Sequence, residues 1–481
     1  MSASTESAVT TGTTQVPRQA DPRRWWALVA VSLATFMTYL DNNVTNVAIP
    51  TIERSLHLSV SGLEWVVSSY LLTLAGLLLV GGRVADVYGR RRVFMGGLAL
   101  FTVSSLAAGL AGSGAVLIAS RAVQGVGAAL LMPTTLAIIM ATFADPKERT
   151  KAIAIWTGIS AMALGLGPVI GGVISEHIRW GWIFLINVPV GVITCVLALT
   201  SVRESKASSV VRTLDVPGLV SSAAALFALT YALIEGGDKG WTSAPIVAAF
   251  ALAAVTLALF LAIEARSAHP MVDLGMFRLR QFSGGTGTMM IWAFGILGIY
   301  FFTSLYLQGI LGFSPTKAGL AFVPMALCVV VAAGAAQALE ARIGGHRLVA
   351  LGMVLMVVGL ILFARLGDHV SYPALLPGFV LFGLGAGMMQ VPLTNGVLQA
   401  TPHARAGIAS ALLNASREVA GLLGITVIGA VLRARESAAV RAGSSTAHAF
   451  VDGYHAGLWV TIGLLIAGVV VSYVTLRPSR N

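Results

Sequence analysis

The chain has 481 residues, of which 56% are hydrophobic and 11% are charged. Soluble domains carry roughly a quarter of charged residues, so this composition excludes a protein whose bulk faces water. The formal net charge of +11 would suggest nucleic acid as a partner of a soluble protein. Here the basic residues fall in short segments between apolar runs, and this pattern indicates membrane orientation rather than nucleic-acid binding.

Residues 1–24 are polar and rich in Ser and Thr. They predict a disordered cytoplasmic arm rather than a cleavable signal peptide. Beyond the arm, fourteen apolar stretches have the length that a bilayer-spanning helix needs, about 20 residues. They are 26–50, 63–82, 93–112, 114–142, 152–175, 182–202, 214–235, 245–264, 283–311, 316–338, 347–365, 373–400, 407–432 and 456–476. The sequence therefore predicts an all-α membrane protein with 14 transmembrane helices.

The distribution of Lys and Arg predicts how the chain is oriented. If the N-terminus is inside, 21 of the 31 Lys and Arg residues lie in inside segments and 8 in outside loops. Because basic residues concentrate on the cytoplasmic side, both termini are expected in the cytoplasm and the protein in the inner membrane. The last external loop is an exception, since Arg433, Arg435 and Arg441 are counted there.

The first inside loop, residues 82–92 (GRVADVYGRRR), has a weaker echo in residues 339–347 (LEARIGGHR). Such repetition suggests duplicated halves with a substrate cavity between them. The predicted organisation is a six-helix bundle at 25–202, a cytoplasmic linker at 203–213, an inserted helix pair at 214–264, a cytoplasmic loop at 265–281, a second six-helix bundle at 282–476 and a cytoplasmic tail at 477–481.

Residues 82–92 resemble the Gly-x-Leu-Ala-Asp-Arg-x-Gly-Arg-Arg signature of the major facilitator superfamily. The whole chain from about Trp25 is similar to the fourteen-span drug:proton antiporter branch of that superfamily. The residues that keep the register are Gly82, Asp86, Gly89, Arg90 and Arg91, whereas Val84 and Val87 depart from it. The resemblance implies a conformational latch at this loop. The alternative is that its arginines only set the topology.

Residues 40–50 (LDNNVTNVAIP) resemble the first-span motif of the same branch, with Asn43 in place of its usual Thr. Asp41 is the residue of most interest there. A carboxylate near the middle of a membrane helix costs about 2.5–3.5 kcal/mol, so it faces a polar cavity or a partner. Such a group takes up a proton when no cation neutralises it. The alternative is a structural Asp41 that is hydrogen-bonded to Asn42 or Asn46.

Residues 117–127 (LIASRAVQGVG) resemble the membrane-embedded Arg motif of the superfamily, and counting residues puts Arg121 at a depth similar to that of Asp41. Arg121 is therefore expected to tune a neighbouring acid, with snorkelling outward as the alternative. In residues 414–421 (NASREVAG), Glu418 is a second candidate proton or cation site. A purely local ion arrangement with Arg417 is equally compatible with that sequence.

Residues 165–172 (GLGPVIGG) resemble the glycine motif of superfamily antiporters, so Gly167, Pro168, Gly171 and Gly172 are expected to form a hinge. Close helix packing alone would also explain these glycines. Residues 180–191 (WGWIFLINVPVG) resemble a further segment of the branch, with Gly181 in place of its Arg.

We therefore predict proton-coupled efflux of drug-like or antibiotic small molecules, with resistance as its consequence and a monomer in the lipid bilayer. A proton-linked metabolite importer and a non-transporting scaffold are the alternatives. The chain has no Gly-x-x-x-x-Gly-Lys-[Ser/Thr] loop for ATP. Cys195 and Cys328 have no neighbours at metal-ligand spacing, so neither a disulfide nor a metal is expected. We expect no enzyme activity, no catalytic residues, no cofactor and no nucleic-acid partner.

Overall fold

A computed structural model describes residues 22–206, 215–267, 270–401 and 406–477. Most of the predicted arm, of the linker and of the tail lies outside these residues. The elements are α1 (Arg24–Leu56), α2 (Val60–Tyr88), α3 (Arg90–Gly109), α4 (Gly114–Thr142), α5 (Pro146–His177), α6 (Trp182–Leu185), α7 (Asn187–Ser201), α8 (Val216–Lys239), α9 (Ala244–Arg266), η1 (Leu274–Arg278), α10 (Arg280–Leu305), η2 (Tyr306–Ile310), α11 (Pro315–Ala321), α12 (Val323–Ile343), α13 (Gly345–Phe363), α14 (Tyr372–Gln399), α15 (Ala406–Arg441) and α16 (Thr446–Thr475).

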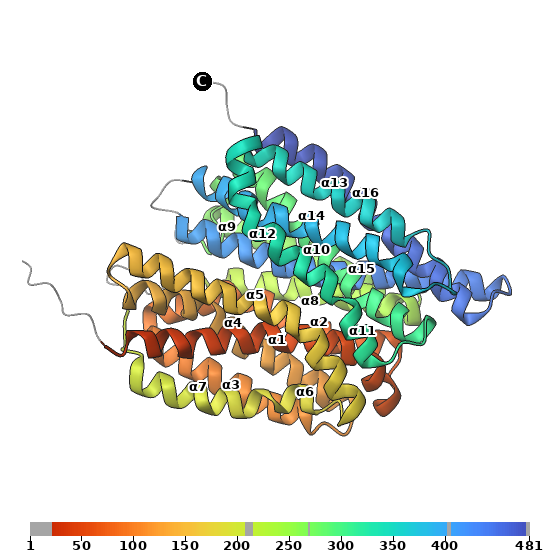
Figure 1. The fold of residues 1–481 in the computed structure, drawn as a ribbon, viewed down its shortest axis with the longest axis horizontal. Coiled ribbons are helices and arrows are strands. Elements are labelled where there is room, and N and C mark those ends of the chain that lie inside the picture. Colours follow the sequence, from red (N-terminus) through yellow and green to blue (C-terminus); the bar gives the residue numbers. More distant parts are fainter. Residues whose placement is uncertain (1–21, 207–214, 268–269, 402–405, 478–481) are drawn as a thin grey trace, which may run out of the picture.

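The described chain is helical throughout, and 13 of its helical segments are long and apolar enough to cross a membrane. Helix α1 is a further long helix of 33 residues, less apolar because Asp41 and three asparagines lie in its middle. The short helices α6 and α11 continue into α7 and α12. Fourteen spans result, and the beginning of α1 and the end of α16 lie at the same end of the molecule (Figure 1). We call this the terminal end, and the opposite one the far end.

The helices form two packed groups (Figure 1). In the first half, α1–α7, the helix pairs α2–α4, α3–α4 and α1–α5 make extensive contacts. In the second half, α10–α16, the corresponding pairs are α13–α14, α12–α14 and α10–α15. Helices α8 and α9 form a hairpin, of which α8 contacts α2 and α15. The two halves touch through α2–α15 and α5–α11.

The two loops with similar sequences also have similar backbones. Gly89 separates α2 from α3 with φ 116°, and Gly344 separates α12 from α13 with φ 85°. L-residues with side chains rarely adopt these angles, so glycine suits both turns. The geometry strengthens the interpretation that the second loop repeats the first.

The prediction of an external loop around Arg433 is wrong. Helix α15 has 36 residues and continues to Arg441, so Arg433 and Arg435 lie on its last turns. The side chain of Arg433 is only 8% exposed. The length of the apolar run alone defined the end of this predicted span. That criterion assigns any arginine to a loop, because it cannot recognise a charge that a residue of another helix neutralises.

Glycine contacts in α2 generate a matched prediction. A Cβ at Gly81 would collide with the backbone of Ala129 in α4, whereas a Cβ at Gly76 would meet nothing within 4 Å. We expect Gly81→Ala to lower the unfolding temperature of the detergent-solubilised protein, because α2 and α4 must separate. Gly76→Ala should leave that temperature unchanged or raise it slightly, since alanine is the better helix former. Equal effects of both changes would contradict this account of the helix contact.

Candidate functional site

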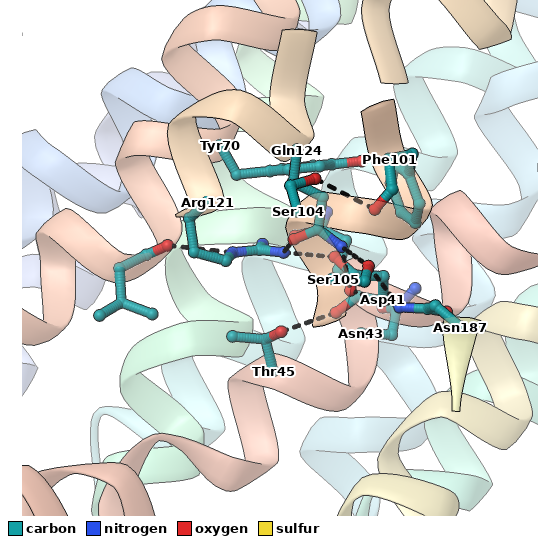
Figure 2. Close-up of polar contacts among 12 residues, drawn as sticks. Asp41, Asn43, Thr45, Tyr70, Phe101, Ser104, Ser105, Arg121, Gln124 and Asn187 are labelled. Atoms are coloured by element: carbon teal, nitrogen blue, oxygen red, sulfur yellow. Dashed lines mark hydrogen bonds and ion pairs between the residues drawn. The ribbon is translucent and has the colours of Figure 1, made fainter. Parts of the chain in front are cut away.

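Asp41 lies at the centre of a polar network inside the first half (Figure 2). Its Oδ2 accepts a hydrogen bond from Nη1 of Arg121, and the side chains of both residues are completely buried. Its Oδ1 accepts hydrogen bonds from the amides of Gln124 at 2.8 Å and Asn187 at 2.9 Å. These donors come from α4 and α7, so three helices together hold one carboxylate.

Arg121 is held on several sides. Its Nη1 also donates to Oε1 of Gln124 at 2.7 Å, and its Nε donates to the carbonyl of Val66 at 3.3 Å. The guanidinium carbon lies 4.3 Å from the ring centroid of Tyr70 and 5.4 Å from that of Phe184. Because aromatic faces attract cations, this surrounding stabilises the charge inside the bundle. Arg121 does not snorkel outward.

Ser105 of α3 completes the network and was missed by the sequence analysis. Its Oγ accepts from the amide of Gln124 at 2.6 Å and from that of Asn187 at 3.3 Å. It thereby orients both amides so that their NH₂ groups face Asp41. A single buried serine in an apolar span carries no recognisable sequence signal. Gln124 and Asn187 lie within the two quoted motifs, but only the structure shows their partner.

The partners expected under the structural alternative, Asn42 and Asn46, do not hydrogen-bond the Asp41 carboxylate within the described residues. Asn46 donates to the carbonyl of Asn42 at 3.2 Å, and Asn43 donates to that of Tyr39 at 2.7 Å. The asparagine side chains thus bond to the backbone of their own helix, one turn back. The partners of the Asp41 carboxylate come from other helices.

A cavity of about 1010 Å³ lies between the halves, in the part of the molecule toward the terminal end. Its walls come from both halves and from α8, and they include Tyr39, Met132, Trp156, Asp215 and Ile408. Gly82, Asp86, Arg90, Arg417 and Glu418 also line it, whereas Asp41 and Arg121 do not. Asp41 therefore faces Arg121 and not the cavity. In this conformation, a molecule in the cavity does not contact the carboxylate of Asp41. Glu418 is the acid beside the cavity at mid-span.

Glu418 forms an ion pair with Arg417, with Nη2 and Oε1 2.6 Å apart. The local arrangement left open by the sequence is therefore present. The contact also reaches the first half, because Arg417 donates to the hydroxyl of Tyr39 at 3.2 Å. Tyr39 lies two residues before Asp41 on α1. One helix thus contacts the buried network on one side and the cavity ion pair on the other.

The loop between α2 and α3 has contacts suited to a latch. Asp86 pairs with Arg90 at 3.0 Å. Both carboxylate oxygens of Glu204 accept backbone N–H bonds at the start of α3, from Arg91 at 3.1 Å and Arg92 at 3.2 Å. A Cβ at Gly89 would lie 2.6–2.9 Å from this carboxylate. Glu204 follows α7 in a polar stretch, and no motif had marked it.

The remaining predicted residues lie at helix contacts. A Cβ at Gly171 would meet the backbone of Val44, and one at Gly167 the side chain of Asn43, so both pack on α1. Gly172 packs against Pro315 of α11 in the second half. Helix α5 continues through Pro168, and the hinge stays a prediction. Gly82 has more space, since its Cβ would lie 3.5 Å from Pro133.

The buried ion pair predicts strongly non-additive mutations. Arg121→Met leaves Asp41 charged and without its cation, and breaking a buried pair typically costs about 3–5 kcal/mol. We expect a large loss of stability in detergent, measured by thermal unfolding. The double change with Asp41→Asn should recover most of this loss, because no unpaired carboxylate remains. Additive effects of the two changes would show that the residues are not energetically coupled.

Comparisons with known proteins bear on the family and on the fold. A sequence profile of the Major Facilitator Superfamily matches residues 31–425. The chain is 37% identical over 413 residues to the multidrug resistance protein Stp of Mycobacterium tuberculosis, which covers 85% of this chain and 76% of Stp. It is 33% identical to the puromycin resistance protein pur8 of Streptomyces alboniger, over 95% of this chain and 92% of that protein.

Solved structures with the same fold include a bacterial homolog of the human lysosomal transporter Spinster, in an inward-facing and unoccupied conformation. It covers 95% of this chain and 98% of its own at a TM-score of 0.67 and 17% identity. A crystal structure of an auto inhibited POT family peptide transporter gives a TM-score of 0.68 at 14% identity, over 93% of this chain and 96% of its own. At these identities the likeness concerns the fold alone. Together with the profile match and the two resistance proteins, the polytopic helical fold shows that the chain is a multi-pass membrane transporter and belongs to the major facilitator superfamily.

Proposed function

We propose that this protein exports drug-like or antibiotic small molecules across the cytoplasmic membrane in exchange for protons, and so confers resistance. The observation that carries the proposal is the buried Asp41–Arg121 pair in helices whose other faces border a large cavity. The matched relatives are named resistance proteins. An ion pair sealed inside a membrane domain favours a role in moving protons, because ionisable groups are costly there.

The conformation and the sidedness belong to the same proposal. The cavity is lined by residues close to the terminal end, such as Asp86, Met140 and Asp215. At the far end, α5 meets α11, where Oε2 of Glu176 accepts from the backbone N–H of Thr316 at 2.8 Å. With both termini in the cytoplasm, as the excess of Lys and Arg favours, this is an inward-facing state. The halves α1–α7 and α10–α16 are then the two units that rock against each other, within a monomer.

The paired state of Asp41 fits the stage after a proton has left for the cytoplasm. Arg121 neutralises the vacated carboxylate, and Gln124 and Asn187 supply two further hydrogen bonds. Asp41 is not exposed here, so it takes up its next proton in a conformation in which the network opens to the outside. A proton arriving at Asp41 weakens its attraction to Arg121, and the pair must re-form before cargo is accepted again.

Cargo binds in the cavity beside Tyr39, Arg417 and Glu418. The cavity volume of about 1010 Å³ is at the upper end of the range of roughly 300–1,000 Å³ typical of small-molecule pockets. The aromatic and methionine side chains of the wall suit apolar cargo, and Glu418 suits a cationic group. Since α1 carries Tyr39 and Asp41 on different faces, movement of this helix couples cargo to the buried pair.

The energy of one proton is sufficient for efflux. A membrane potential of 100 mV supplies about 2.3 kcal/mol, and one pH unit supplies about 1.4 kcal/mol. At about 1.4 kcal/mol per factor of ten, one proton sustains a gradient of a few hundredfold for a neutral compound.

Transport in inverted membrane vesicles tests the proposal, with puromycin as the first candidate cargo because one relative is named for resistance to it. Asp41→Asn lowers stability because Arg121 loses its anion, but Arg121 keeps its bonds to Gln124 and the carbonyl of Val66, so the protein should still fold. The change should abolish proton-driven puromycin uptake into the vesicles. Undiminished uptake by Asp41→Asn would reject its role as the proton carrier. If the wild type does not transport puromycin, a susceptibility panel in a host without its own pumps identifies another cargo for the same assay.

Glu418→Gln separates cargo recognition from proton movement. We expect this change to weaken binding of cationic cargo about tenfold or more, because a charge-assisted contact is lost, with a smaller effect on neutral cargo. Glu340→Gln is the matched control, since this acid does not line the cavity. Equal effects of the two changes on a panel of cationic and neutral compounds would contradict the placement of cargo beside Glu418.

A further inference from the structure

A second buried ion pair joins the two halves at the far end, where the proposed mechanism assigns no proton-binding group. Glu64 of α2 pairs through Oε1 with Nη1 of Arg433 in α15. The side chain of Glu64 is fully buried and that of Arg433 is 8% exposed. Glu64 begins the second turn of α2, about 6 Å along the helix from Val60. The pair therefore lies close to the far-end surface and not at the depth of the cavity.

The surrounding backbone leaves room for this pair. A Cβ at Gly429 of α15 would collide with the carboxylate of Glu64, and a Cβ at Gly237 of α8 would lie 3.1 Å from Nε of Arg433. Glycines thus occur on both sides of the two charged groups. The carboxylate lies directly against α15, so α2 cannot move away from α15 at this end without separating the ion pair.

Helix α8 of the hairpin α8–α9 holds the arginine from a third side. Nη2 of Arg433 donates to the carbonyls of Leu233 at 3.1 Å and Ile234 at 3.0 Å. These carbonyls lie near the C-terminal end of α8, the negative end of the helix dipole. Arg433 therefore keeps two acceptors if Glu64 is withdrawn. Glu64 has no equivalent second cation, and its Oε2 is buried without a hydrogen-bond partner within the described residues.

The other charged groups around the pair are mostly acidic. Glu235 and Asp238 of α8 face it, with Lys239 bound to Glu235 at 3.2 Å, and Glu436 lies one turn beyond Arg433. Glu235 also accepts from Nε1 of Trp65 at 2.8 Å, so α8 is bound to α2 as well. The negative charges of these acids stabilise Arg433 where it lies. They destabilise a charged Glu64 from which Arg433 has been withdrawn.

We propose that Glu64 is a proton-binding site on the external side, and that its ion pair with Arg433 is the gate that closes this side. When the outer ends of α2 and α15 separate, water reaches Glu64 and a proton replaces Arg433, which stays on the carbonyls of α8. The proton lowers the cost of burying a carboxylate that has lost Arg433 as its cation. The hairpin α8–α9 thereby acquires a function: α8 stabilises the arginine while the gate is open.

The assignment of this end to the outside rests on the proposed function, but the gate itself is tested without transport. Purified protein with Cys195 and Cys328 replaced by alanine is labelled with spin probes at Gly112 and Ala447, in far-end segments of the two halves. A second labelled pair, at Lys147 and Arg342, reports the terminal end. Pulsed electron-spin distance measurements are then made from neutral to acidic pH. Labelling of Gly112→Cys in intact cells by an impermeant reagent establishes which end is external.

In the wild-type background, acidification should lengthen the far-end distance and shorten the terminal-end distance. Glu64→Gln should raise the ratio of far-end-open to far-end-closed protein about tenfold or more at neutral pH, with a smaller further change on acidification than the wild type shows. Glu53→Gln is the matched control, because Glu53 lies on α1 at the same end and forms no ion pair within the described residues. It should behave like the wild type.

Gly429→Ala gives a second route if Glu64→Gln does not fold. It keeps both charges but pushes the carboxylate away from α15, so it should also open the far end. Gly463→Ala, at which a Cβ meets nothing within 4 Å, is its control. A far end that does not respond to pH in the wild type, or one that stays closed in both Glu64→Gln and Gly429→Ala, overturns the proposal. Loss of export with the pH response intact would count against the proposed function and leave the gate standing.

Discussion

The energetic constraint on this protein is that a carboxylate must be kept inside a membrane domain. Asp41 meets that constraint by pairing with Arg121 and by accepting from Gln124 and Asn187. The interior of a membrane domain offers little water to stabilise charge, so each of these bonds is stronger there than at a surface, and the loss of any one costs more. The carboxylate of Asp41 joins α1 to α4 and α7, and Ser105 adds α3 through its bonds to the two amides.

The same constraint explains why α1 is central. It carries Asp41 and three asparagines in its middle, and it packs against α5, α7, α4 and α10. Asp41 faces the interior of the first half, while Tyr39 contacts Arg417 of the second. A change in the charge of Asp41 alters the packing of α1 within its own half, and this change reaches the cavity without direct contact between cargo and carboxylate. The two buried pairs, one inside a half and one between halves, have different roles in this account.

The sequence predicted the all-helical membrane fold, the number of spans and the superfamily, because apolar length and local motifs carry that information. It also put Asp41 and Arg121 at one depth, since residue counting along two helices suffices for that. It did not place Asp41 away from the cavity, because the rotation of α1 depends on packing with α5 and α7. Ser105 and Glu204 were missed since neither belongs to a quoted motif. The Glu64–Arg433 pair joins residues 369 positions apart. Arg433 was expected in an external loop, and no motif marked Glu64.

Cargo-induced proton release tests the central claim most directly. Purified transporter in weakly buffered detergent solution is mixed with a transported compound, and the released protons are counted with a pH-sensitive dye. Binding is followed in parallel by tryptophan fluorescence. The account predicts that the wild type releases protons on binding and that Asp41→Asn binds the compound but releases fewer protons per bound molecule. Equal proton release from Asp41→Asn and the wild type would contradict it.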